Sequence, residues 1–478
     1  MAMAEAGVSA GEFSKTMCCR AFLLLLLSGI AAAMGTVVTS LPGFNGTLPF
    51  YLETGYVGVG EDEDVQLFYY FVESQRSPFQ DPLMLWLTGG PGCSCLSAFF
   101  FESGPLIFQF EGYEGGLPNL LLNDYSWTQN LNILYVDAPV GTGFSYSETQ
   151  GGYYVDDYKS AKQIYDFLRK WLGAHTKFLE NNLYVGGDSY SGIIVPMVTQ
   201  EIVYGNEIGR KPSLNLIGYV LGNPVTDSFI DDNSRVAFAN RLTLIPDELY
   251  KSAKQSCNGD YVNVDPGNVL CREDIDSIDV LIEDINLLNI LQPYCGYASR
   301  PHAQEFYRRR SLKEKPEPSL ISSTNPAYYC HDYLYVLVDV WANNETVQQA
   351  LNVRMGTTGV WERCNTSLAY DKVVTSSVVY HKNLTAASLR ALVYSGDHDM
   401  SVPHLGTQAW IRALNLTLSN VWRAWFVDGQ VAGYTRRFTE DNYALTFATV
   451  KGAGHVAPEY KSKECYAMID RFFAYYPL

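Results

Sequence analysis

Short apolar runs along the chain alternate with stretches in which apolar side chains recur at helical spacing. Tyr158 to Leu172 is such a helical stretch, and Ile193 to Val203 is a second, strongly apolar one. Strands that alternate with helices predict an α/β fold with a largely parallel sheet covered on both faces. The runs predicted as strands are Leu83 to Leu87, Leu131 to Val136, Leu183 to Val185, Leu214 to Leu221, Leu389 to Tyr394 and Leu445 to Val450.

The stretch from about residue 233 to residue 324 interrupts this alternation. It is polar, contains three of the cysteines and lacks the succession of strand, turn and helix. We interpret it as a lid inserted on the sheet rather than as an independent domain. Within it, Arg308, Arg309 and Arg310 precede a proline-rich segment. This segment is either a solvated loop or a proteolytic processing site, and cleavage there would produce a two-chain form.

The first 35 residues have the pattern of a cleaved secretory signal. Residues 21–33 form a short apolar run after Lys15 and Arg20, and small residues follow it. Both Met1 and Met17 remain candidate start residues, because a start at Met17 gives a signal of more usual length. No later stretch approaches the roughly 20 apolar residues that a membrane span needs. We therefore expect a mature domain over residues 36–478 without a membrane span, located in the vacuole or outside the cell.

Composition narrows the class of protein further. The 478 residues are 47% hydrophobic and 18% charged, which is typical of a globular chain with a sizeable core. Lysine and arginine number 34 against 51 acidic residues, so the formal net charge is −17. Such a balance argues against binding to nucleic acid. The 7 histidines are scattered and form no metal-binding motif, so we expect neither a metal nor a cofactor.

Cysteines and glycosylation sequons agree with the secretory route. Removal of the signal discards Cys18 and Cys19, and the cysteines that remain favour disulfides in an oxidising compartment. Sequons of the form Asn-x-Ser/Thr predict a glycoprotein, although each is a frequent chance match. They begin at Asn45, Asn344, Asn365, Asn383 and Asn415.

Ser189 occupies the strongest local motif. The apolar run that ends at Val185 is followed by Gly186-Gly187-Asp188-Ser189-Tyr190-Ser191, and the apolar helical stretch comes next. A tight turn between a strand and a helix, with small residues on both sides of a serine, is typical of a nucleophile elbow. The motif departs from the common form at its last position, where Ser191 replaces glycine.

An acid and a histidine follow in the chain order that a catalytic triad on this fold requires. Asp399 lies in the loop after one predicted strand, and His455 follows a glycine-rich turn after another. We take Asp399 as the partner of His455 and assign Asp397 to holding the turn. His398 is a weaker candidate for the base because it precedes the acid.

A glycine-rich loop provides candidate oxyanion donors. Thr88-Gly89-Gly90-Pro91-Gly92-Cys93 follows the strand that ends at Leu87. The backbone N–H of Gly90 and that of Tyr190, next to the nucleophile, are expected to form the oxyanion hole. A phosphate-binding loop is the alternative interpretation, and the loop lacks the Gly-Lys-Ser/Thr ending which that reading requires.

Taken together, these motifs resemble the serine carboxypeptidase family and, within it, the plant serine carboxypeptidase-like acyltransferases. The resemblance covers nearly all of the expected mature chain, through residues 55–59, 67–71, 89–94, 139–146, 186–191, 396–399 and 454–455. It implies an α/β-hydrolase fold with a mostly parallel central sheet and a helical lid. It also implies disulfides between Cys93 and Cys364, Cys257 and Cys271, and Cys295 and Cys330. Cys95 and Cys465 then remain free, buried as small apolar residues.

The residues next to the motifs point to a subclass. Family peptidases typically carry asparagine before the oxyanion glycines and glutamate before the nucleophile, where both help to bind the terminal carboxylate of a peptide. Thr88 and Asp188 stand at these positions, as in the acyltransferase branch. Glu102 matches a third residue of the same carboxylate-binding network, and this one is retained. With Gly89, these residues are expected to line the substrate site. Recognition of a terminal carboxylate is expected to be weaker as a result.

The resemblance implies a two-step acyl transfer. The donor would be a small-molecule 1-O-β-glucose ester, the intermediate an acyl-enzyme on Ser189, and the acceptor a second small molecule with a hydroxyl group. Two alternatives remain open. One is a serine carboxypeptidase that hydrolyses peptide C-termini, and the other is an inactive binding glycoprotein that keeps the fold.

Overall fold

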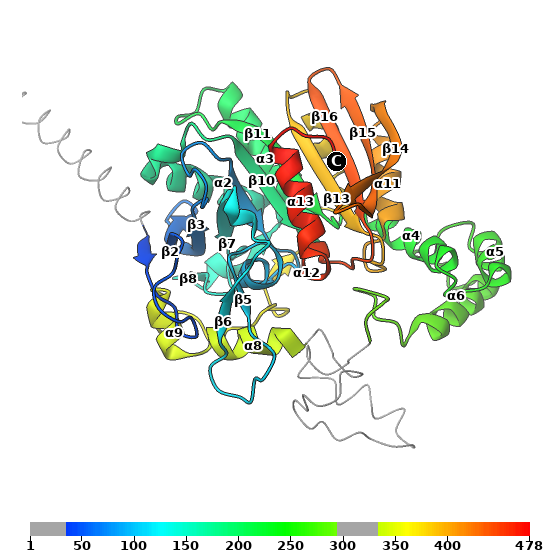
Figure 1. The fold of residues 1–478 in the computed structure, drawn as a ribbon. Helices are drawn as coiled ribbons and strands as arrows, with labels where there is room; N and C mark the ends of the chain where they lie inside the picture. Colours follow the sequence, from blue (N-terminus) through cyan, green and yellow to red (C-terminus); the bar gives the residue numbers. More distant parts are fainter. Residues whose placement is uncertain (1–34, 294–332) are drawn as a thin grey trace, which may run out of the picture.

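The computed structural model describes residues 35–293 and 333–478 (Figure 1). The expected signal peptide lies outside these residues apart from Gly35. The Arg308 to Arg310 run and the expected pair of Cys295 and Cys330 also lie outside them. Within the described part of the chain, no helix combines the length and the apolar character that a membrane span needs.

One large sheet passes through the molecule, and its centre is parallel. The central strands lie in the spatial order β7-β4-β10-β11-β13-β16, and each neighbouring pair is parallel. Every run predicted as a strand overlaps one of them, which confirms the predicted α/β class. Their bounds are β4 Leu83–Leu87, β7 Asn132–Val136, β10 Leu183–Asp188, β11 Leu216–Gly222, β13 Arg390–Gly396 and β16 Tyr443–Val450.

Both edges of the sheet are antiparallel. At one edge β3 joins β7 and continues to β2 and β1, and at the other β16 continues to β15 and β14. Short connections join β2 to β3, β14 to β15 and β15 to β16, and a tight turn can join only antiparallel neighbours. Asp428 and Gly429 form such a turn, both with positive φ. These strands are β1 Thr36–Val38, β2 Leu52–Val59, β3 Val65–Val72, β14 Thr417–Val427 and β15 Gln430–Glu440, while β8 Tyr146–Ser147 pairs with β3.

Helices cover both faces of the sheet. In β4, Leu83 and Leu85 pack into one apolar cluster while Met84 and Trp86 pack into the other, as expected for a strand buried on both sides. On the Leu85 face lie α2 Asp157–Ala174, α3 Ser191–Glu207, α10 Val378–Leu384 and α11 His404–Ala413. On the Trp86 face lie α8 Tyr333–Ala342, α9 Glu345–Ala350, α12 Ala457–Tyr460 and α13 Ser462–Phe473.

Three helices extend beyond the sheet on the side of α11, where Figure 1 draws them in green. They are α4 Ser228–Arg241, α5 Asp247–Ser256 and α6 Val269–Ile282. The segment predicted as an insertion from residue 233 thus begins inside α4. These helices share a small apolar core that includes Phe238, Ile278 and Met400. Since Met400 directly follows Asp399, this core adjoins the loop that carries the candidate acid.

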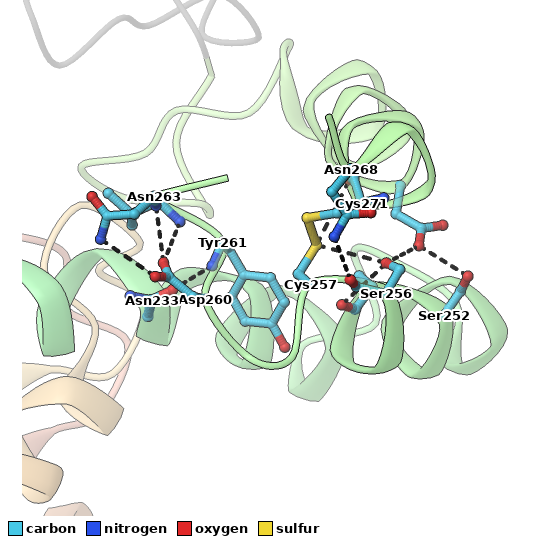
Figure 2. The surroundings of a disulfide bond; sticks show 12 residues. Asn233, Ser252, Ser256, Cys257, Asp260, Tyr261, Asn263, Asn268 and Cys271 are labelled. Atoms are coloured by element: carbon cyan, nitrogen blue, oxygen red, sulfur yellow. Dashed lines mark hydrogen bonds between the residues drawn. A yellow bond between two sulfur atoms is a disulfide. The ribbon is translucent and has the colours of Figure 1, made fainter. Parts of the chain in front are cut away.

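A disulfide ties α5 to α6, as the resemblance implied (Figure 2). It joins Cys257 at the end of α5 to Cys271 in the first turn of α6. Asn268 caps α6 by accepting a hydrogen bond from the Cys271 N–H at 3.2 Å, and its side-chain amide donates to the Ser256 carbonyl at 2.8 Å. The Asn233 side-chain oxygen accepts from the Tyr261 N–H at 2.6 Å. The loop between α5 and α6 is therefore fastened at both ends.

Candidate active site

The turn between β10 and α3 presents Ser189. This residue has φ of 53°, in the left-handed region that non-glycine residues seldom adopt. A Cβ at Gly187 would lie 2.6 Å from the Leu87 carbonyl oxygen and 2.7 Å from the Ser191 Cβ, so only glycine fits there. Ser191, the departure from the common motif, is accommodated because its hydroxyl donates to the Leu87 carbonyl at 3.1 Å.

Ser189, His455 and Asp399 form one hydrogen-bonded chain. The His455 Nε2 lies 2.8 Å from the Ser189 Oγ, and the His455 Nδ1 lies 2.8 Å from an Asp399 carboxylate oxygen. The three residues follow β10, β16 and β13, whose carboxyl ends meet at the same edge of the parallel sheet. The topology of the sheet therefore brings His455 next to Ser189, which is 266 positions away in the sequence, and next to Asp399, which is 56 positions away.

Asp399 is fully buried and held by several donors. Its Oδ1 accepts from the N–H groups of Ser401 at 2.8 Å and Val402 at 3.0 Å. Its Oδ2 accepts from the Asn223 side-chain amide at 2.7 Å, and the Asn223 side-chain oxygen in turn accepts from the Gly396 N–H at 3.2 Å. Asn223 was not predicted from the sequence, although its position directly after β11 is a visible signal.

His455 is nearly buried, and its pKa is raised above the ordinary imidazole value. Burial acts in the opposite direction and lowers the pKa, but the Asp399 carboxylate outweighs it, with a further contribution from Asp188.

The loop that carries His455, the base loop, and the loop that carries Asp399, the acid loop, both form hydrogen bonds with the segment after α6. The His455 N–H donates to the Leu288 carbonyl at 2.6 Å, and the Ser401 N–H donates to the Leu287 carbonyl at 2.9 Å. One segment therefore links the acid loop to the base loop.

Asp397 and His398 lie near the hydrogen-bonded residues Ser189, His455 and Asp399 but are not part of that series. Asp397 accepts a hydrogen bond from the Gly452 N–H at 2.7 Å and contacts the His398 Nδ1 at 2.5 Å. These contacts tie the Asp397 loop to the turn that precedes His455. The arrangement agrees with the expectation that Asp397 holds the turn.

The glycine-rich loop lies directly against the elbow. A Cβ at Gly89 would be 2.6 Å from the Ser189 Cβ and 2.7 Å from the Tyr190 nitrogen, so the close approach requires glycine. Gly90 has φ of 116°. Within the described residues, the backbone N–H groups of Gly90 and Tyr190 donate to no protein acceptor. Both amides are therefore free to bind an oxyanion near Ser189. The Tyr190 hydroxyl donates to Asp157 at 2.7 Å, which anchors the residue.

Buried acids lie behind the nucleophile. Burial raises the pKa of Asp188 to about 6, against the lowering influence of His455 and of the Gly89 amide. Burial, followed by the charges of Asp188 and Glu459, raises the pKa of Glu102 well above its ordinary value. One carboxylate oxygen of each, Asp188 Oδ1 and Glu102 Oε2, is buried and has no hydrogen-bond partner in the described part of the chain. Such groups are able to donate to a substrate oxygen while protonated.

The Thr88 hydroxyl makes its hydrogen bond with a thiol. It donates to the Cys95 Sγ at 3.4 Å, and the Cys95 thiol itself donates to the Val136 carbonyl at 3.0 Å. Cys95 and Cys465 are both free and buried, as predicted. The Cys93–Cys364 disulfide is present and fastens the end of the oxyanion loop to the segment before Asn365.

Among the residues that the structure describes, no cluster of acidic, histidine or cysteine side chains has the composition of a metal site.

Comparisons with known proteins find similar sequences along nearly the whole chain. The family described as serine carboxypeptidase matches residues 42–475. Serine carboxypeptidase-like 7 from Arabidopsis thaliana is 45% identical over 469 residues, covering 98% of this chain and 100% of the relative. Serine carboxypeptidase-like 2 from the same plant is 46% identical over 455 residues, covering 95% of this chain and 96% of the relative.

A solved structure shows the same fold. The Kex1 prohormone-processing carboxypeptidase from Saccharomyces cerevisiae superimposes with a TM-score of 0.70 at 19% identity, covering 93% of this chain and 94% of that chain. This likeness, together with the central sheet and its covering helices, identifies the α/β-hydrolase fold. The family match extends over nearly the whole chain, and the chain therefore belongs to the serine carboxypeptidase family.

Proposed function

We propose that this protein is an acyltransferase that moves an acyl group from a 1-O-β-glucose ester to the hydroxyl of an acceptor. The observation that carries the proposal is the side chain at position 88. Family peptidases typically carry an asparagine amide there, whereas the Thr88 hydroxyl is directed to the Cys95 thiol at 3.4 Å. A terminal carboxylate bound behind Ser189 would therefore lack the amide donor.

Asp188 supports the same assignment. It is one methylene shorter than the glutamate of the peptidases, so its carboxyl group lies closer to the β10 backbone. A site that recognises a carboxylate through hydrogen bonds loses affinity steeply when a donor is absent or displaced. An ester of a neutral sugar makes no such demand on the site, because it contains no terminal carboxylate to be neutralised.

In the first step, His455 accepts the Ser189 proton at Nε2 while the Ser189 oxygen attacks the ester carbonyl. Asp399 holds the imidazole through Nδ1 and stabilises the imidazolium that forms. The N–H groups of Gly90 and Tyr190 bind the oxyanion of the tetrahedral intermediate. The bond to the glucose oxygen then breaks, and His455 returns the proton to the departing sugar. The acyl group remains on Ser189 as an ester.

In the second step, the hydroxyl of the acceptor occupies the place of the departed glucose. His455 removes its proton, the hydroxyl oxygen attacks the acyl-enzyme, and the second tetrahedral intermediate collapses to the new ester and free Ser189. Hydrolysis is the same step with water as the nucleophile. Transfer therefore depends on a site that binds the acceptor and excludes water.

A carboxypeptidase is the second candidate, and Glu102 is the observation that favours it. This residue is retained from the carboxylate-binding network, and it is buried beside Asp188 with a raised pKa. A protonated Glu102 would donate a hydrogen bond to the terminal carboxylate of a peptide. Incubation with a blocked dipeptide and, separately, with benzoyl glucose plus an alcohol acceptor distinguishes the two candidates. Efficient dipeptide cleavage without ester formation would refute the acyltransferase assignment.

Replacing Thr88→Asn together with Asp188→Glu is expected to raise kcat/KM for a blocked dipeptide by about tenfold to a hundredfold, since a hydrogen bond to a charged group contributes about 1.5–3 kcal/mol. The matched control is Thr88→Ser with Asp188→Glu, which keeps a hydroxyl and adds no amide. A folded Asn/Glu variant whose dipeptide cleavage equals that of the control would show that position 88 does not set the substrate class.

The profile of activity against pH is expected to have a rising limb, because His455 must be neutral to accept the Ser189 proton. Since the pKa of His455 is raised, the midpoint of this limb is expected above 6.5, the ordinary imidazole pKa. Asp188→Asn removes one of the charges that raise this pKa, so the limb is expected to move to lower pH. The measurement is kcat/KM against pH for a chromogenic ester. Asp397→Asn serves as the control, and an unmoved limb in Asp188→Asn would contradict the coupling.

The compartment belongs to the same proposal. Disulfides at Cys93–Cys364 and Cys257–Cys271 support folding in the secretory pathway, where such bonds persist. We place the protein in the vacuole or outside the cell, with small-molecule donor and acceptor as its partners.

A further inference from the structure

A cavity of about 320 Å³ opens on the sheet between β13, β14, β15, β16 and the last residues of the chain. In Figure 1 the mark for the C-terminus lies over these strands. Arg390 stands at the start of β13 and Ala444 near the start of β16, whereas Asp399 and His455 follow the ends of the same strands. A strand rises about 3.3 Å per residue, so the cavity lies roughly 20 Å from the catalytic edge.

The register of the sheet directs three arginines into this cavity. Arg437 pairs with Thr446 on β16, and Arg423 pairs with Thr435, two residues before Arg437. Arg390 pairs with Ala444, two residues before Thr446. Because side chains alternate between the two faces of a strand, Arg390, Arg423 and Arg437 share one face.

The Arg436 side chain lies on the opposite face of the sheet. Its neighbour across the strands is Phe447, and its guanidinium lies 4.8 Å from the centre of the Trp422 ring. Its side chain therefore belongs to the other face, although the residue also borders the cavity. The positive charge of the cavity comes from Arg390, Arg423 and Arg437.

None of these three arginines forms an ion pair with any described carboxylate, including that of Leu478, which also lines the cavity. Arg423 and Arg437 are exposed, and within residues 35–293 and 333–478 no side-chain hydrogen bond holds either of them. The chain as a whole has a formal net charge of −17. This concave site carries three positive charges that no described carboxylate pairs with, so its charge is opposite in sign to the net charge of the molecule.

Arg390 is held in a defined orientation at one side of the cavity. Its guanidinium donates to the Phe472 carbonyl at 2.7 Å and to the Tyr184 hydroxyl at 3.4 Å. It also lies 3.7 Å from the centre of the Tyr475 ring. These contacts leave some of its five N–H donors unused, and they reduce the entropy that a ligand would cost on binding.

We propose that this cavity binds a small anion that carries at least two phosphate or carboxylate groups. Guanidinium groups present paired N–H donors that match the oxygens of both groups. A single negative charge would leave most of the local positive charge uncompensated, so a multiply charged ligand fits better. The volume lies at the lower end of the range for small-molecule sites, about 300–1,000 Å³. The Asn420 amide and the Thr446 hydroxyl add neutral hydrogen-bonding groups at the cavity wall.

Isothermal titration of the full chain with pyrophosphate and, in a separate arm, with citrate tests the proposal at low ionic strength. The wild-type protein is expected to bind at least one of them saturably with one site per chain. Arg423→Ala with Arg437→Ala is expected to raise Kd by about tenfold or more, because two charge-assisted contacts are lost. Binding of pyrophosphate alone would identify phosphate esters as the ligand class, and binding of citrate alone would identify polycarboxylates.

The matched control is Arg210→Ala with Arg272→Ala, which removes the same charge from exposed positions elsewhere. It is expected to bind like the wild type. Equal loss of affinity in both double variants would assign the effect to net charge and overturn the site. Absence of saturable binding to the wild type in both arms would overturn it as well. Thermal melting of each variant checks its folding, and neither arm depends on the acyl-transfer activity.

Discussion

Replacing Ser189→Ala is expected to lower kcat for acyl transfer by about 10⁴-fold to 10⁶-fold, the range found when the nucleophile of a serine triad is removed. The hydroxyl that attacks the ester is lost, while the elbow and its hydrogen-bond partners other than His455 remain. Folding is expected to be retained, because the side chain packs little apolar surface. The measurement is ester formation from benzoyl glucose and an alcohol acceptor, followed over a single turnover and in the steady state.

Ser191→Ala is the matched control for this variant. The residue lies two positions further along the same turn, and its hydroxyl donates to the Leu87 carbonyl rather than to His455. It is expected to lose stability of about 1 kcal/mol and to retain most of the activity. A serine-directed phosphonate provides an assay independent of the acyl donor, and it should label the wild type and Ser191→Ala but not Ser189→Ala. Transfer by a folded Ser189→Ala variant would remove Ser189 from the mechanism.

Replacing Asp399→Asn is expected to lower kcat by about 10⁴-fold, the loss seen when the acid of a triad becomes an amide. The change keeps the shape of the side chain and the two N–H donors at Oδ1. It removes the negative charge that stabilises the imidazolium of His455 and that directs a proton to Nδ1. The loss should therefore appear in kcat, and thermal stability is expected to fall as well, because the Asn223 amide that donates to Oδ2 loses its acceptor.

Asp397→Asn tests the same loop with the other acid. Asp397 contacts His398 and the Gly452 N–H, and it makes no hydrogen bond with His455. Its loss is expected to reduce kcat less than tenfold, through a looser turn before His455. Equal losses in the two variants would mean that the loop as a whole, and not the Asp399 charge, supports His455.

Several parts of the fold could be predicted because they depend on local patterns. Leu83–Leu87 is a strand in the structure with the bounds that the apolar run indicated, and the end of β16 at Val450 also agrees. Runs that are apolar at every position indicate strands buried on both faces, and the glycines after them indicate where the chain must turn. The motif around Ser189 could be recognised from the adjacent residues alone, since the strand, the turn and the helix follow one another directly in the sequence.

Other features could not be predicted from local patterns. Polar residues interrupt the apolar residues of β14, and most of the strand is exposed at the sheet edge, so the antiparallel edge formed by β14 and β15 was missed. The start of α4 at Ser228 was also missed, because the polar composition of the segment resembles that of a loop. The contact of Asn223 with Asp399 joins residues 176 positions apart, and only the pairing of β11 with β13 places them side by side.

The sequence by itself determined the α/β class, the positions of the central strands and the chain order of Ser189, Asp399 and His455. Apolar periodicity and turn residues act over a few positions, so they are legible in the chain. The tertiary structure alone decided which donors hold Asp399, how Leu287 and Leu288 fasten the acid and base loops, and where the Thr88 hydroxyl is directed. It also gathered Arg390, Arg423 and Arg437 into one cavity, because strand register, not sequence separation, sets which side chains share a face.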